Sequence, residues 1–172
     1  MSRMRVVVGL LAVALVAGCG SPTLATVAPA TKPTAGVAIT GDVKATGVLT
    51  NEDIAGLPQQ TVDVTFASSK GEEKHAETGV LLSEVISPSA LATTDRKNDL
   101  LSFAVLAIGA DGYTAAVSYG EVSPDFGNRG ILIATAEDGK PLDRPRLVVP
   151  GDVKGGRYVS ELVELKVVRL PV

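Results

Sequence analysis

The sequence predicts an α+β domain in which β-sheet dominates and helices are few and short. The apolar residues are mainly Val, Leu, Ile and Ala, with three Phe, three Tyr and no Trp. Several segments alternate apolar and polar residues, which is typical of half-buried strands. The dipeptide Asp-Gly occurs twice between such segments, and this favours tight hairpins. Runs of strands with only two helical patterns therefore indicate a sheet-rich α+β domain.

The domain is expected to begin with a strand and a short helix. Residues 36–43 alternate apolar with small or polar residues and predict the first strand. Residues 50–58 predict a helix, because Thr50 precedes Asp53 at the spacing of a capping box and Pro58 ends the pattern.

The next part of the chain is expected to contain a strand, a charged connection and a second helix. Residues 60–68 carry apolar side chains at every second position, so they predict a half-buried strand. Residues 71–79 are charged and predict either a connection or an exposed hairpin. Residues 80–91 place four aliphatic residues on one helical face, and Pro88 ends the regular part of this predicted helix.

The second half of the chain is expected to consist of strands joined by turns. Asp111 and Gly112 predict a hairpin between two strands, and residues 129–143 repeat the pattern with an Asp-Gly turn at 138–139. The remaining strands are expected within 101–109, 113–118, 144–150 and 157–170.

The amino terminus predicts a cleaved lipoprotein signal. Arg3 and Arg5 are followed by the apolar run 6–16, and small residues precede Cys19. This pattern indicates removal of residues 1–18 and attachment of lipid, such as palmitate, to Cys19. We therefore expect a domain anchored through this lipid to a bacterial membrane, in the cell envelope outside the cytoplasm.

A tether and a single domain are expected to follow the signal. Residues 19–36 are rich in Thr, Ala and Pro without periodicity, which is typical of a flexible tether. Residues 37–172 have the length of one ordinary domain. Removing residues 1–18 takes away two arginines and no acids, so the net charge moves from −3 to −5. This acidity argues against nucleic acid as a partner.

Several kinds of catalytic or metal site are disfavoured by composition. Cys19 is the only cysteine, so the expected lipid leaves no thiolate for a disulfide, a nucleophile or a metal. His75 is the only histidine and cannot alone build an ordinary zinc site, so a surface histidine is expected. Neither a Gly-x-Ser-x-Gly elbow nor a phosphate-binding Gly-Lys-Ser/Thr loop is present.

The stretch "RLVVPGDVKGGRYVSEL", residues 146–162, carries the most distinctive candidate. Its double glycine precedes Arg157, and glycines allow the backbone to approach a ligand closely. An arginine in that position is suited to bind an oxyanion in a groove. The alternative is an ordinary turn between strands with a solvated arginine.

The segments "GVLLSEVI", "ADGYTAAVSYGEV", "LIATAEDGKPL" and "RPRLVVPGDVKGGRYVSELVELKV" together resemble the sulfite-oxidase-like, molybdopterin-binding domain in its compact exported form. The resemblance spans roughly residues 37–168. It implies a mixed α+β sandwich, a molybdenum-carrying pterin in full members, and a place for Arg157 beside the oxyanion or the pterin phosphate.

The sequence departs from this family at the position of the metal-binding cysteine. Catalytic members hold molybdenum with a cysteine shortly after the strand that here ends in Ala67, Ser68 and Ser69, and a serine hydroxyl is a poor substitute for a thiolate. We therefore expect no bound cofactor, although the resemblance alone would imply molybdopterin. The candidate ligand-binding residues are Ser68, Asp111, Tyr113, Arg146 and Arg157, and no catalytic or metal-binding residue is assigned.

Three functional hypotheses remain. The first is a lipid-anchored domain that binds a small ligand or an envelope protein in the groove formed by the Asp-Gly-Tyr hairpin, the Ser68 region and the Gly-Gly-Arg loop. The second is an oxidoreductase that holds molybdopterin through pterin contacts alone. The third is a structural envelope lipoprotein that uses an exposed sheet edge.

Overall fold

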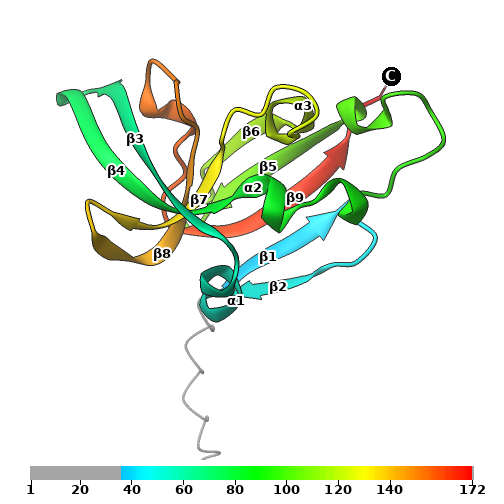
Figure 1. Cartoon of the computed structure of the whole chain (residues 1–172), viewed down its shortest axis with the longest axis horizontal. Coiled ribbons are helices and arrows are strands. Elements are labelled where there is room, and N and C mark those ends of the chain that lie inside the picture. The colour runs from blue at the N-terminus through cyan, green and yellow to red at the C-terminus, as the bar shows by residue number, and fades with distance from the viewer. Residues whose placement is uncertain (1–35, 172) are drawn as a thin grey trace, which may run out of the picture. The chain divides into compact units, whose positions relative to one another are not determined.

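The structure, a computed structural model, describes residues 36–171 and contains nine strands and six short helices in this range (Figure 1). The strands are β1 (Gly36–Gly41), β2 (Gly47–Thr50), β3 (Gln59–Ser68), β4 (Gly71–Leu81), β5 (Phe103–Gly109), β6 (Thr114–Ser118), β7 (Leu132–Glu137), β8 (Lys140–Val148) and β9 (Leu162–Arg169). The α-helices are α1 (Asn51–Gly56), α2 (Leu82–Val85) and α3 (Tyr119–Val122). The 3-10 helices are η1 (Pro88–Ala90), η2 (Asp99–Ser102) and η3 (Gly155–Arg157).

The strands form two sheets. The five-stranded sheet has the order β2-β1-β9-β5-β6, and the four-stranded sheet has the order β3-β4-β7-β8. All pairs are antiparallel except β1 with β9, which run parallel. The sheet-rich α+β class expected from the sequence is confirmed.

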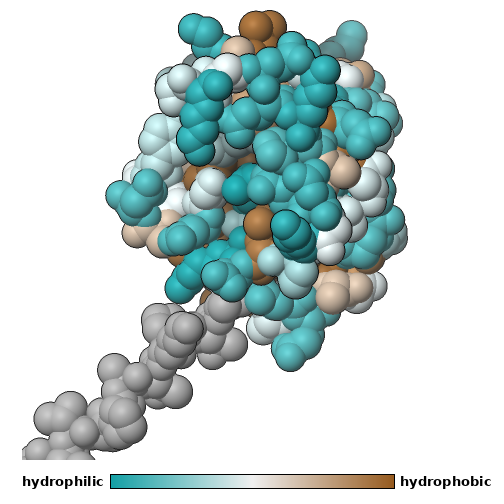
Figure 2. Space-filling view, turned by 90° about the vertical axis from the view of Figure 1, so that its left-hand side faces the viewer, coloured by the Kyte–Doolittle hydropathy of each residue, from teal (hydrophilic) through white to brown (hydrophobic). Residues whose placement is uncertain are grey.

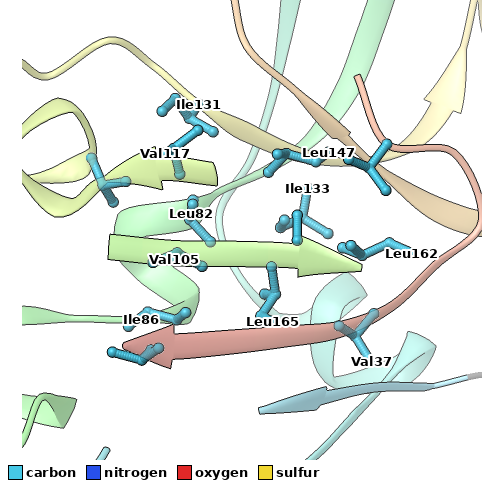
Figure 3. Packing of buried hydrophobic residues seen from close by; sticks show 14 of the residues in the cluster. Val37, Leu82, Ile86, Val105, Val117, Ile131, Ile133, Leu147, Leu162 and Leu165 are labelled. Carbon is cyan, nitrogen blue, oxygen red and sulfur yellow. The ribbon is translucent and has the colours of Figure 1, made fainter. Parts of the chain in front are cut away.

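The main core is formed by apolar side chains from both sheets. Val105 of β5 and Leu165 of β9 belong to the same buried cluster as Ile133 of β7 and Leu147 of β8 (Figure 3). Phe103 and Tyr119 are the largest fully buried side chains of the domain. Burial of these aliphatic groups supplies the main driving force for folding.

The capping box and the Asp-Gly turns expected from the sequence are confirmed. Thr50 caps α1 and forms the full capping box with Asp53, as its spacing predicts. The Asp-Gly turns join β5 to β6 and β7 to β8, with positive φ at Gly112 (83°) and Gly139 (74°). These are positions where glycine fits without steric cost.

The expected helix over 80–91 is wrong in its first part. Strand β4 continues to Leu81, because Val80 and Leu81 pair with Ile133 and Leu132 of β7. Only α2 and η1 are helical in this segment, and residues 71–79 form most of β4 rather than a connection. Residues 71–79 do form a hairpin with β3, but the expected exposure is wrong, because Glu77 and Gly79 are buried and only three of the nine residues are exposed. Pairing within a sheet overrode a helical apolar pattern.

Three sequence-based expectations concern the amino terminus. The predicted signal segment, Cys19 and the tether up to residue 35 lie outside the described residues, and Gly36 is the first residue of β1. Within residues 36–171 no helix is both long and apolar enough to span a bilayer.

Candidate functional site

The structure brings together three of the segments singled out in the sequence. The closing loop, defined here as residues 150–157, packs against the end of β3, where the Ala67 amide donates a hydrogen bond to the Val153 carbonyl (2.8 Å). On its other side the Tyr113 hydroxyl donates to the Gly156 carbonyl. The Ser68 region and the Asp-Gly-Tyr hairpin therefore both flank the Gly-Gly-Arg loop.

The first glycine of the pair serves close packing. A Cβ atom added at Gly155 would lie 2.8 Å from two carbons of the Phe66 ring, whereas one at Gly156 would meet nothing within 4 Å. Any side chain at position 155 would thus push the ring of Phe66 away. Gly155 allows the closing loop to lie directly on β3.

Arg157 is held by two carboxylates. Its Nε and Nη2 donate to the two carboxylate oxygens of Asp152, at 2.8 and 2.7 Å, in a bidentate pair. Its Nη1 donates to Glu121 of α3 at 3.2 Å. These partners, Asp152 first, raise the pKa of Arg157 above its ordinary value. An oxyanion at this position would have to compete with both carboxylates.

Ser68 and Asp111 make local turn contacts. The Ser68 hydroxyl accepts a hydrogen bond from the Lys70 amide (3.0 Å) at the β3–β4 turn. Asp111 accepts one from the Tyr113 amide (2.9 Å) at the β5–β6 turn. Both contacts are of the kind that stabilises tight turns.

Arg146 is the sequence candidate that lines a polar cavity. The cavity has a volume of about 340 Å³ and lies between the β3–β4 hairpin, β8 and the start of the segment after the closing loop. Its lining consists of Phe66, Lys70, Glu73, His75, Glu137, Arg146, Gly155, Tyr158 and Ser160. Figure 2 shows the side of the domain that carries the β3–β4 and β7–β8 hairpins, and this face is predominantly hydrophilic.

Strand alternation and register place the charged side chains of the cavity. Glu73, His75 and Glu77 occupy every second position of β4 and so point to one face of the sheet. Phe66 of β3 lies opposite Glu73, and Glu137 of β7 lies opposite Glu77. Two carboxylates directly opposite each other repel, so this register requires a compensating cation.

Arg146 supplies that cation. Its Nη1 contacts Glu77 Oε1 at 3.3 Å and also forms an ion pair with Glu137. The side chain of Glu77 is fully buried, and burial raises the pKa of this carboxyl, with a further contribution from the negative charge of Glu137. Arg146 opposes this rise by favouring the ionised form.

His75 lies at the centre of the acidic groups. Its Nδ1 is 2.9 Å from Asp138 Oδ2 and 4.0 Å from Glu137 Oε2, and its Nε2 is 3.4 Å from Glu73 Oε2. The hydrogen bond with Asp138 is the largest cause that raises the pKa of His75 above its ordinary value. Its side chain is 22% exposed, so the expected surface histidine is in fact a half-buried part of the cavity wall.

Two buried polar atoms near the cavity have no hydrogen-bond partner: Glu77 Oε2 and the hydroxyl of Tyr158. The Tyr158 ring packs against Phe66 with centroids 4.6 Å apart. Burial, with smaller contributions from Asp152 and Glu77, raises the pKa of Tyr158 to about 12, so its hydroxyl stays protonated. A buried polar group without a partner is costly, and such groups are rare in native domains.

Sequence reasoning singled out Arg146, expected His75 to be a surface residue without a role, and missed Glu73, Glu137 and Tyr158. The available signal was the spacing of Glu73, His75 and Glu77, which places all three on one side of a strand. It was not used because residues 71–79 were expected to be a connection or an exposed hairpin. Among residues 36–171 no group of three or more His, Cys, Asp or Glu side chains is arranged to hold a metal ion.

Comparisons with known proteins identify the fold. No protein-family model matches the chain, and no curated protein matches it in sequence. Among solved structures, the sulfane dehydrogenase SoxCD from Paracoccus pantotrophus is similar with a TM-score of 0.62 and 20% identity. The match covers 77% of this chain and 38% of that chain, so this chain corresponds to less than half of that protein. The similarity supports a sulfite-oxidase-like fold and extends to the fold alone.

Proposed function

We propose that this chain is a lipid-anchored envelope protein whose sulfite-oxidase-like domain binds a small polar ligand in the cavity beside Arg146. The fold similarity to SoxCD supports the sulfite-oxidase type expected from the sequence. The lipoprotein pattern that ends at Cys19 supports the anchor.

The observation that carries the binding function is a preformed cavity of about 340 Å³ whose wall includes Tyr158, a residue with a buried hydroxyl that has no hydrogen-bond partner. That volume is at the small end of the range for ligand pockets. The charged walls are held by ion pairs that span β4, β7 and β8, so the cavity is preformed. A ligand that hydrogen bonds to Tyr158 would satisfy a group that the protein itself leaves unpaired.

The cofactor implied by the fold does not fit the residues present. The chain has no cysteine after Cys19, so the thiolate that molybdenum prefers is missing. At the closing loop, Ala67 is hydrogen bonded to Val153, and Arg157 is bound by Asp152 and Glu121. We therefore derive no oxidoreductase step for this protein.

A thermal-shift screen of small polar metabolites against the soluble domain tests the binding function. We expect at least one compound to raise Tm, with its affinity reduced by Tyr158→Phe. The matched control is Tyr113→Phe, which removes a hydroxyl outside the cavity that is bonded to Gly156. Stabilisation that is insensitive to Tyr158→Phe, or no stabilising compound at all, would contradict binding at this cavity.

The anchor has a separate test. Expression of the full chain in a bacterial host should yield a protein that starts at Cys19 and carries lipid, as measured by mass spectrometry of the amino-terminal peptide. Cys19→Ala should move the protein from the membrane fraction to the soluble fraction. A wild-type protein with an unmodified Cys19 would contradict the anchor.

A further inference from the structure

We propose that the free edge of β3 is a docking site for an extended, basic segment of a partner protein, which adds to the four-stranded sheet as a further strand. This site is separate from the cavity beside Arg146 and does not depend on it. Three features support the inference: unpaired backbone groups along β3, the lack of the devices that protect the other edges, and the side chains beside the edge.

The pairing of β3 with β4 determines which backbone groups of β3 point outward. Ser68 and Gly71 pair across a two-residue turn, so the even-numbered residues of β3 share hydrogen bonds with β4 and the odd-numbered residues point away from it. The Ala67 amide agrees with this alternation, because it donates outward to the Val153 carbonyl of the closing loop.

Three successive outward-pointing residues of β3 have unpaired backbone groups. They are Thr61, Asp63 and Thr65, and within residues 36–171 neither strand pairing nor a turn gives their N–H and C=O groups a partner. All three residues are exposed, and the main neighbours of β3 are β4 and η3. A row of such groups is a template onto which another strand can hydrogen bond.

The other three edges of the two sheets are short or obstructed. Strands β2 and β6 are only four and five residues long. Strand β8 contains Pro141 and Pro145, and its Leu147 is hydrogen bonded to Val159. Strand β3 is ten residues long, contains no proline and pairs with β4 without a bulge (Figure 1). Natural sheets usually protect a long edge by such devices, so an unprotected one indicates a docking site.

One face of this edge offers apolar surface. Val62 and Phe66 are partly buried and pack against the small cluster that contains Val64, Leu132 and Val148. Side chains of neighbouring strands align on the same face of a sheet, so an added strand with apolar residues at every second position would extend this cluster.

The other face selects the charge of the added segment. Asp63 is the only charged residue of β3, and it lines a recess of about 300 Å³. The other charged groups that line the recess already have partners: Lys74 pairs with Glu72 at 3.0 Å, and His75 pairs with Asp138 at 2.9 Å. The recess therefore favours a lysine or arginine opposite Asp63.

A second copy of this chain fits the edge less well than a basic segment does. Pairing of two β3 edges would bring two Asp63 carboxylates close to each other, and the whole chain has a net charge of −3. Like charges on neighbouring strands destabilise their pairing. The occupant is therefore a segment of another protein.

The test uses two capped heptapeptides, Thr-Val-Lys-Val-Lys-Val-Thr and Thr-Val-Glu-Val-Glu-Val-Thr, and amide hydrogen exchange followed by NMR. In the free protein the amides of Thr61, Asp63 and Thr65 should exchange rapidly, whereas β4 protects those of Val62 and Val64. Near saturation the lysine peptide should slow exchange at the three outward amides by about tenfold. The glutamate peptide should bind at least about threefold more weakly.

A backbone-modified peptide separates strand addition from simple charge attraction. N-methylation of the five internal residues of the lysine peptide removes its backbone donors and leaves every side chain and charge in place. This peptide should no longer protect the outward amides, because strand addition depends on main-chain hydrogen bonds. Protection by the methylated peptide would overturn strand addition.

Two variants of the protein locate the contact. Thr65→Pro removes an outward N–H, which an edge strand tolerates, and should weaken the lysine peptide by about tenfold. Asp63→Asn should abolish the preference for lysine over glutamate, whereas Asp143→Asn, an exposed acid on β8, should leave it unchanged. The amides of Val62 and Val64 report whether the hairpin is intact; if Thr65→Pro unfolds it, Asp63→Asn and the methylated peptide still decide the question.

Three results would overturn the proposal. The first is unchanged exchange at the outward amides of β3 with either peptide. The second is a glutamate peptide that binds as tightly as the lysine peptide, which would contradict the basic class of the segment. The third is protection in the free protein that grows with protein concentration, which would make this edge an interface between copies of the chain. None of these results bears on ligand binding in the cavity.

Discussion

Two arginines of this domain each bind two carboxylates, yet they lie in different environments. Arg157, in the closing loop, pairs with Asp152 and Glu121, whose side chains are 15% and 29% exposed. Arg146, in β8, pairs with Glu137 and with Glu77, which is fully buried. At Arg157 both carboxylates are partly in water, whereas at Arg146 one carboxylate oxygen is buried without a partner.

The difference indicates where a ligand can gain free energy. The pair around Arg157 is satisfied by protein groups, so a ligand there would have to displace one of them. The surroundings of Arg146 contain a cavity, so a ligand there can add contacts without displacing a protein group. The first glycine of the pair before Arg157, Gly155, serves packing against Phe66 rather than exposure of the arginine.

Replacement of Arg146 should have the largest effect on stability. Arg146→Ala leaves the buried carboxylate of Glu77 without a counter-charge, which we expect to lower the free energy of unfolding by about 3 kcal/mol at neutral pH. Urea denaturation measures this change. Arg144→Ala, two residues earlier on β8, is the control and should change stability by less than about 1 kcal/mol. If Arg146→Ala lowered the free energy of unfolding by less than Arg144→Ala does, the Glu77 carboxyl would have to be neutral in the wild-type protein.

Replacement of Arg157 should have a smaller effect on stability and none on the cavity. Because its partners are partly exposed, Arg157→Ala should lower the free energy of unfolding by about 1 to 2 kcal/mol. Arg157→Lys should restore only part of this loss, since one ammonium cannot replace the bidentate pair. The affinity of a ligand found in the thermal-shift screen should stay unchanged in both variants, and a loss of affinity would make Arg157 part of the ligand site.

Two tyrosine hydroxyls are expected to differ by about 1 kcal/mol in what they contribute to the free energy of unfolding. The Tyr119 hydroxyl donates to the Ile86 carbonyl at 2.8 Å inside the core, so Tyr119→Phe should destabilise the domain by about 1 kcal/mol. The Tyr158 hydroxyl has no partner, so Tyr158→Phe should leave stability unchanged or raise it slightly. Paired urea titrations measure both. A similar loss in the two variants would show that Tyr158 already has a partner in the ligand-free protein.

The smallest effect concerns the protonation of His75. Its folded-state pKa is raised, so the stabilisation from its acidic neighbours is fully present below its unfolded pKa, near 6.5, and is lost as the pH rises through the folded value. Asp138→Asn should lower the pKa of His75, as measured by an NMR titration of its ring protons. A titration midpoint unchanged by Asp138→Asn would show that the Asp138 contact does not set this pKa.

The fold was predictable where the signal was local. The capping box of Thr50 and Asp53 and the two Asp-Gly turns depend on residues close in sequence, and each occurs where it was expected. The end of β4 was not predictable in this way. Val80 and Leu81 fit one face of a helix, but their pairing with β7 depends on residues about fifty positions away.

The site was less predictable than the fold for the same reason. Arg146 was singled out by its residue type, whereas its partners Glu77 and Glu137 come from two other strands. The unpaired hydroxyl of Tyr158 follows only from side-chain packing against Phe66. Spacing along β4 would have predicted a shared face for Glu73 and His75, but not the cavity in front of them.

The measurement that tests the central claim most directly is the molybdenum and pterin content of the protein. The full chain is expressed in a host that makes molybdopterin, exported and purified gently, and then analysed for molybdenum and for pterin fluorescence after oxidation. We expect a folded protein with neither component, because the chain lacks the thiolate and its closing loop is occupied by protein contacts. Near-stoichiometric molybdenum and pterin would contradict the binding-domain proposal and make the protein an oxidoreductase with an unusual ligand set.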